Sequence, residues 1–220
     1  MQAINRVSKR LRKKIALYIA KVLLHLDLND VELLDDKVLV NEPRAALLVK
    51  VGGSSKDAYV LHIEIRNENQ AELPWQMLRN RAEFVTTYPG LPIQQCVLYI
   101  GNSPLNMPSE IEEDYLLYRF QIVDLHAQVA DELLALGSPQ SSVLAILGDF
   151  HGLPANLMIR RILMQLSKLL STDPDAFNDC MAILDVLADI RQLQNVFREE
   201  ATLLRTGTPL DVSPDLALSE

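Results

Sequence analysis

The chain has 220 residues, of which 49% are hydrophobic and 23% charged, so it can build one sizeable core. Its formal net charge of −8 argues against a surface covered with phosphate contacts. No apolar run reaches the roughly 18 residues of a membrane-spanning helix, and the N-terminus lacks a signal-peptide pattern, so we expect a cytoplasmic protein with no membrane partner.

Residues 3–25 are predicted to form a basic amphipathic helix that docks on a sheet. Apolar side chains recur there every three or four positions. The segment 1–25 also holds seven of the 21 basic residues and no acid. Its cations Lys9, Arg10, Arg12 and Lys13 are candidates for DNA contact, or else they form a solvated face that the acidic body neutralises.

Three strands are predicted next. Residues 33–40 are expected to be extended, and residues 45–51 resume as a strand rich in Val and Leu after an interruption at 41–43. Residues 52–57 begin Gly-Gly-Ser-Ser, which is typical of a hairpin turn, and lead into a strand over residues 59–66.

The strand over 59–66 carries the main candidate site. Alternation places His62, Glu64 and Arg66 on one face and the apolar residues 61, 63 and 65 on the other. A carboxylate and a cation two residues apart form half of a metal-dependent phosphodiesterase site, in which Glu64 holds Mg²⁺ and Arg66 steadies phosphate charge. The preceding strand should bring a second carboxylate, but Ala46 stands there. In the alternative interpretation Glu64 is a structural acid paired with Arg66, with His62 or with an arginine of the next helix.

The rest of the chain is predicted to contain one more helix, two strands and then helices only. The spacing of Trp75, Leu78, Ala82 and Val85 indicates a helix from residue 72 to about residue 88. We predict an interior strand over 93–100, another strand over 115–125, helices over 131–136, 141–147 and 154–170, and one long last helix from 172–174 towards Arg205. Cys96 and Cys180, far apart and without metal-ligand spacing, are expected to be buried thiols.

This order of elements predicts an α/β protein with a restriction-endonuclease-like core, in which helices flank a mixed central sheet. We divide the chain into a core at 1–170 that includes the basic helix, a helical extension at 171–205, and a flexible tail at 206–220. Apolar residues at helical spacing in the extension suit either a core or a self-association face, so a homo-oligomer built through these helices is one expectation.

Six short sequence motifs lie between residues 33 and 125. Their order and spacing along the chain are more specific than any single motif. The motifs are Leu-Leu-Asp-Asp at 33–36, Asn-Glu-Pro-Arg at 41–44, Leu-His-Ile-Glu at 61–64, Met-Leu-Arg at 77–79, Val-Leu-Tyr-Ile-Gly at 97–101 and Tyr-Arg-Phe-Gln-Ile-Val-Asp-Leu at 118–125. With them the chain resembles the PD-(D/E)XK nuclease superfamily, and within it the bacterial recombination-promoting nuclease and transposase family. The resemblance implies Mg²⁺-dependent cleavage of DNA, linked to recombination or mobile elements.

The chain departs from that family at the catalytic positions. In the family an aspartate follows Arg-Ala in the first strand, and the second strand ends Glu-x-Gln or Glu-x-Lys. Here Glu64 matches, whereas Ala46 replaces the aspartate and Arg66 takes the last position. A guanidinium stays protonated and is a poor general base, and Mg²⁺ is usually held through one or two carboxylates. We therefore expect nuclease activity that is weak or absent.

Two further classes of function stay open. The chain is either a non-catalytic scaffold that binds nucleic acid or protein, or a self-associating module. Asp36, Glu42 and Glu68 are the acids near enough in sequence to complete a metal site, and Arg79 of the predicted helix is a further candidate for DNA contact. The nuclease interpretation requires that Glu64 faces an open hollow large enough for a polyanion. Burial of Glu64 in a closed ion pair, or a sheet of different strand order, would contradict it.

Overall fold

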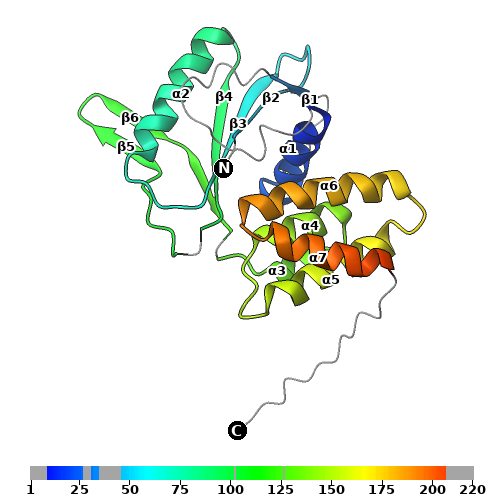
Figure 1. The fold of residues 1–220 in the computed structure, drawn as a ribbon. Helices are drawn as coiled ribbons and strands as arrows, with labels where there is room; N and C mark the ends of the chain where they lie inside the picture. Colours follow the sequence, from blue (N-terminus) through cyan, green and yellow to red (C-terminus); the bar gives the residue numbers. More distant parts are fainter. Residues whose placement is uncertain (1–8, 27–30, 35–45, 102, 126, 207–220) are drawn as a thin grey trace.

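The computed structural model describes residues 9–26, 31–34, 46–101, 103–125 and 127–206. This part of the chain is an α/β protein with a five-stranded mixed sheet, flanking helices and a helical C-terminal region (Figure 1). The predicted α/β class and mixed sheet are thus confirmed. The strands, in their order across the sheet, are β1 Val31–Leu33, β2 Ala46–Val51, β3 Tyr59–Arg66, β4 Ile93–Tyr99 and β7 Gln121–Asp124.

The sheet is antiparallel in its first half and parallel in its second. β1, β2 and β3 form an antiparallel meander, and β3, β4 and β7 run parallel to one another. Gly52 and Gly53 have positive φ values of 86° and 51° in the predicted hairpin turn between β2 and β3, a conformation that glycine adopts without strain. Helix α2, Leu73–Thr87, makes the crossover from β3 to the parallel strand β4.

One face of the sheet belongs to the main hydrophobic core. Helix α1, Lys9–Leu23, packs there through Ile15 and Ile19, together with the C-terminal helices. α1 lies within the predicted range 3–25, whose residues 3–8 fall outside the described part of the chain. The alternation predicted for β3 is confirmed, since its odd-numbered residues enter this core. The core residues in and next to β2, β3 and β4 are Leu47, Val49, Val51, Leu61, Ile63, Ile65, Cys96, Leu98 and Ile100.

Helix α2 covers the opposite face of the sheet (Figure 1), but not with the residues whose spacing predicted it. Its buried side chains include Leu73, Met77 and Phe84. Trp75 and Val85 are 46% and 49% exposed. The helix therefore has two apolar stripes. The stripe that carries Met77 and Phe84 packs against strands β3 and β4 of the sheet.

The strand predicted over 115–125 is two short strands in different sheets. β6, Leu116–Arg119, pairs with β5, Glu110–Glu113, in a separate antiparallel hairpin, and β7 joins the main sheet after a break at Phe120. β5 was not predicted because three of its four residues are glutamates, which are depleted in strands.

The C-terminal half is helical, as predicted, but the prediction of a single long last helix is wrong. Gln192 has a left-handed φ of 60°, and the Leu193 amide donates to Ala188 O at 2.7 Å, so the chain reverses there. The reversal lets the last helix pack back on its neighbours, where Glu200 pairs with Arg160. The helices are α3 Ala130–Ala135, α4 Pro139–Leu144 with a 3₁₀ turn at Ala145–Leu147, α5 Ala155–Leu169, α6 Pro174–Ile190 and α7 Gln194–Thr206.

One hydrophobic cluster joins the sheet, α1 and the C-terminal helices. Ile183, Leu184 and Leu187 of α6 are buried in it, so these apolar residues serve the core of a single chain. The division at residue 170 stays a prediction. Of the predicted tail at 206–220, Thr206 is the last residue of α7, and residues 207–220 lie outside the described part of the chain. No helix in the described part of the chain is both long and apolar enough to cross a bilayer.

Candidate functional site

Glu64 and Arg66 form a buried ion pair beneath α2. Ala46 lies directly opposite Glu64 in the β2–β3 register, as the sequence predicts. Arg66 Nη2 donates to Glu64 Oε1 and, at 3.0 Å, to Oε1 of Gln76 on α2. Glu64 has no exposed surface, and Arg66 is 3% exposed. The predicted pair of site residues is therefore brought together, but away from solvent.

A hydrogen-bonded network continues from this pair to β4 and β6. Gln95 Nε2 lies 3.0 Å from Met77 O and 3.3 Å from His62 Nδ1, and the Tyr118 hydroxyl donates to Gln95 Oε1 at 2.7 Å. A backbone carbonyl only accepts, so the Gln95 atom that faces Met77 is the amide nitrogen. This orientation leaves Gln95 Oε1 free to accept the hydrogen bond from the Tyr118 hydroxyl. Burial raises the pKa of Tyr118, so the phenol keeps its proton.

His62 is an inner histidine whose Nδ1 faces the Gln95 amide nitrogen. Its ring is fully buried and meets the Phe84 ring edge-on, with centroids 5.0 Å apart. Because the Gln95 amide donates to Nδ1, the neutral ring carries its proton on Nε2. That Nε2 lies 3.7 Å from Glu64 Oε2. His62 therefore links the Gln95–Tyr118 end of the network to the ion pair.

Sequence reasoning missed three members of this network, namely Gln76, Gln95 and Tyr118. Gln95 carries a signal in the sequence, because it and Gln94 are the polar residues of an otherwise apolar interior strand, and Gln95 is the buried one of the two. Its partner could not be inferred, since only the parallel β3–β4 register places Gln95 next to His62. Gln76 gives no comparable signal, because a glutamine on a helix is ordinary.

The residues around Glu64 do not fit a magnesium ion. The position opposite is apolar, and the one carboxylate already accepts from a guanidinium. Across the described residues, no group of three or more His, Cys, Asp or Glu side chains is placed to hold a metal. Glu68 is exposed and lines a separate hollow of about 230 Å³ with Gly101. Asp36 and Glu42 lie outside the described residues.

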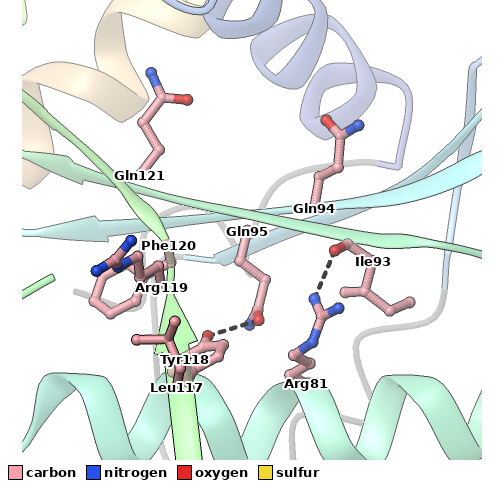
Figure 2. A pocket seen from close by; sticks show the side chains of 9 residues that line it. All are labelled: Arg81, Ile93, Gln94, Gln95, Leu117, Tyr118, Arg119, Phe120 and Gln121. Carbon is pink, nitrogen blue, oxygen red and sulfur yellow. Dashed lines mark hydrogen bonds between the residues drawn. The ribbon is translucent and has the colours of Figure 1, made fainter. Parts of the chain in front are cut away.

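The expectation that Glu64 faces an open hollow is wrong. A hollow of about 650 Å³ does lie between α2, the start of β4 and the β6–β7 segment, but Glu64 is not among its lining residues. Figure 2 shows that Arg81 crosses part of it to donate to Ile93 O at 2.6 Å, while Tyr118 and Gln95 bond to each other. Glu64 stays inside because α2 closes over it through the Gln76 contact with Arg66.

The candidate DNA ligands on α1 are partly engaged with α6. Arg10 Nη2 lies 2.8 Å from Asp179 Oδ2, and Lys14 donates to the same carboxylate oxygen. The hydrogen bond from Lys14 is the largest of the effects that hold the Asp179 pKa below its ordinary value. Lys13 is half-buried. The predicted neutralisation of basic helix residues by the acidic body thus holds for Arg10 and Lys14.

The other candidate DNA ligands do not share one described surface with them. Arg79 is exposed on α2, and α2 covers the opposite face of the sheet from α1. The side chains of Lys9 and Arg12 lie outside the described part of the chain. A single duplex bound along α1 would therefore leave Arg79 behind the sheet.

Both cysteines are free and buried, as predicted. Burial raises the pKa of the Cys96 thiol to about 12, and it also raises the pKa of Cys180. A thiol of this kind is not a nucleophile near neutral pH. The cysteines therefore add no chemistry to the site.

Comparisons with protein-family models, with curated proteins and with solved structures found no match to this chain.

Proposed function

We propose that this chain is a non-catalytic binding scaffold. In it, the positions that would perform metal-dependent cleavage in a nuclease instead fasten α2 to the sheet. One observation carries the proposal: Glu64 is buried in an ion pair with Arg66, opposite the apolar Ala46.

The order of elements supports a restriction-endonuclease-like fold for this scaffold. Helix α1, the antiparallel strands β1, β2 and β3, the crossover helix α2 and the parallel strand β4 follow one another as in that fold. The closed ion pair counts against the nuclease resemblance, and the strand order counts for it. The buried ion pair meets the condition under which the nuclease interpretation is rejected, so the proposal keeps the fold alone, without the nuclease activity, because a shared fold does not carry function.

The chemistry of the pair supports the loss of catalysis. Removing two charges from water is costly unless each compensates the other, so the Glu64–Arg66 pair resists separation. A metal ion would have to replace the guanidinium, and the residue opposite Glu64 is the apolar Ala46, which offers no second carboxylate. Arg66 stays protonated and cannot act as a general base.

Protein is the partner class that the geometry favours. Arg10 and Lys14 already share a carboxylate with α6, which reduces the positive charge of α1 available to DNA. Duplex DNA binding with a steep salt dependence, lost on neutralising Lys13 and Arg10, would instead favour nucleic acid.

The proposal is tested by titrating the full chain with Mg²⁺ and Mn²⁺ in a calorimeter and by incubating it with supercoiled DNA. We expect no saturable metal binding at Glu64 and no cleavage. Cleavage by the wild-type chain that EDTA abolishes would overturn the proposal without any variant. So would saturable metal binding that Glu64→Gln removes and that Glu110→Gln, at an exposed glutamate paired with Arg119, leaves intact.

A further inference from the structure

The hollow between α2, the start of β4 and the β6–β7 segment is lined by two arginines and, among the described residues, by no acid. We call it the arginine hollow, after Arg81 and Arg119. Its volume is about 650 Å³, and small-molecule sites in proteins occupy roughly 300–1,000 Å³. The chain as a whole has a net charge of −8, so this positive lining runs against its composition. The arginine hollow therefore favours an anionic ligand of small-molecule size.

Arg81 comes from α2 and reaches into the arginine hollow, where its guanidinium is held in one place (Figure 2). Its Nη1 donates to Ile93 O at 2.6 Å. Among the described residues, no carboxylate pairs with Arg81, and no acceptor takes the donors on its Nε and Nη2. Burial raises the pKa of Tyr118, and the Arg81 charge is close enough to oppose that rise. A half-buried, oriented guanidinium with spare donors can hold a phosphate through two hydrogen bonds.

Arg119 supplies the second cation, at the rim. Its Nε donates to Glu110 Oε2 at 2.7 Å, in a pair whose side chains are 63% and 46% exposed. An exposed pair of this kind is weak, and it uses one of the five donors of the guanidinium. The terminal nitrogens of Arg119 therefore stay available to a ligand.

The other polar side chains of the arginine hollow are not available to a ligand. Gln95 and Tyr118 are buried and bond to each other at 2.7 Å. Figure 2 shows Gln94 and Gln121 pointing to the other side of the sheet from Arg81. Recognition of a charged ligand by side chains therefore falls to the two arginines.

The end of the arginine hollow away from Arg81 combines apolar and aromatic surface. Leu117 is 62% exposed, and Phe120 is half-buried, with its ring centroid 5.8 Å from that of Tyr118. In Figure 2, Arg119 and Phe120 lie at this end and Arg81 at the other. Planar rings stack on aromatic faces and on guanidinium planes. The two ends thus suit the two parts of one ligand, an anionic group and a planar ring.

We propose that the arginine hollow binds a phosphate monoester that carries a planar ring, of the size of a nucleoside monophosphate. Arg81 binds the phosphate, and Phe120 and Arg119 hold the ring. A phosphate monoester carries a charge of about −1.5 to −2 at pH 7, which two guanidinium groups balance better than they balance a single carboxylate. This inference goes beyond the proposed function, because a scaffold that binds protein requires no small ligand.

The test is isothermal titration calorimetry of the full chain with adenosine monophosphate (AMP), with adenosine and with inorganic phosphate. We expect saturable binding of AMP. Adenosine lacks the group that Arg81 binds, and inorganic phosphate lacks the ring. Each should therefore bind at least about tenfold more weakly than AMP.

Variants place the ligand in the arginine hollow. Arg81→Gln should weaken AMP at least about tenfold and leave the affinity for adenosine unchanged. Phe120→Leu should weaken AMP and leave inorganic phosphate unchanged. Arg119→Gln, at an exposed side chain that the fold does not need, should weaken AMP about two- to fivefold. Arg198→Gln is the matched control, because Arg198 is also an exposed arginine in an ion pair but does not line this hollow.

Three results would overturn the inference. They are the absence of saturable AMP binding, equal affinity for AMP and inorganic phosphate, and an AMP affinity that Arg119→Gln and a folded Arg81→Gln chain both retain. Urea denaturation checks that each variant is folded, and Arg119→Gln decides alone if Arg81→Gln is not. None of these results depends on metal binding at Glu64 or on DNA cleavage. The two proposals therefore fail separately.

Discussion

Removing the Glu64 carboxylate should destabilise the protein strongly. In the wild type, Arg66 is 3% exposed, and its Nη2 donates both to Glu64 and to Gln76. Glu64→Ala would leave the guanidinium buried with only a neutral amide as its partner on that nitrogen. Breaking a buried ion pair from one side costs about 3–5 kcal/mol, because the remaining charge is uncompensated. For a chain of this size that loss lowers the midpoint of thermal unfolding by roughly 6–20 °C.

A much smaller change in the free energy of unfolding is expected when both charges are removed together. A buried pair that is replaced by apolar residues of similar volume is often neutral or stabilising, by about 1–4 kcal/mol. Glu64→Leu combined with Arg66→Met should therefore recover most of the stability that Glu64→Ala loses. The pair would then show a large coupling in a double-mutant cycle.

Urea denaturation followed by circular dichroism measures both variants, and an exposed pair supplies the control. Glu110→Ala removes the partner of Arg119 at the surface, where the expected loss is below about 1 kcal/mol. A catalytic carboxylate in an open cleft behaves differently, since its removal relieves like charge or has no effect on folding. Unchanged or increased stability in Glu64→Ala would refute the closed pair.

Three further predictions concern other parts of the fold. Glu200→Ala removes a buried partner of Arg160 and should cost about 2–3 kcal/mol in denaturation, whereas Arg198→Ala, in an exposed pair, should cost less than about 1 kcal/mol. The Asp179 pKa is lowered from 3.8 on folding, so its contribution is present above that pH and is lost as the pH falls through the lowered pKa. Asp179→Asn should therefore be less stable than the wild type near neutral pH and equal to it in strong acid, and a pH-independent difference would contradict this. Cys96, with a pKa raised to about 12, should not react with a thiol reagent at pH 8 until urea unfolds the chain; rapid reaction of the folded protein would contradict its burial.

Local rules predicted the β3 site well. Strand alternation placed His62, Glu64 and Arg66 on one face, and the glycine-containing turn set the register that puts Ala46 opposite Glu64. The predicted fold class depended on the same signals, hydrophobic periodicity and turn composition. These signals are local in sequence, so one chain without its structure is enough to find them.

Burial of the site could not be predicted, because it depends on which side of α2 meets the sheet. Two stripes of α2 are apolar, and the one that first identifies the helix, with Trp75 and Val85, is the exposed one. The other packs on the sheet through Met77 and Phe84 and brings Gln76 to Arg66. Tertiary packing decides between two stripes of similar periodicity.

The break in the C-terminal helix has no sequence signal of the usual kind. Gln192 takes a left-handed conformation that glycine or asparagine normally provides. No proline or glycine lies between α6 and α7, so periodicity continues through the break. The energy for the reversal comes from packing α7 on α5, including the Arg160–Glu200 pair, which lies 40 residues apart in sequence.

The most direct measurement is the anomalous scattering of a crystal soaked in Mn²⁺. A nitrogen of Arg66 on the Glu64 carboxylate, with no manganese peak within coordination distance of either carboxylate oxygen, is the predicted result. A manganese ion bound to Glu64, with the Arg66 guanidinium turned away from it, would contradict the assignment of this pair as structural.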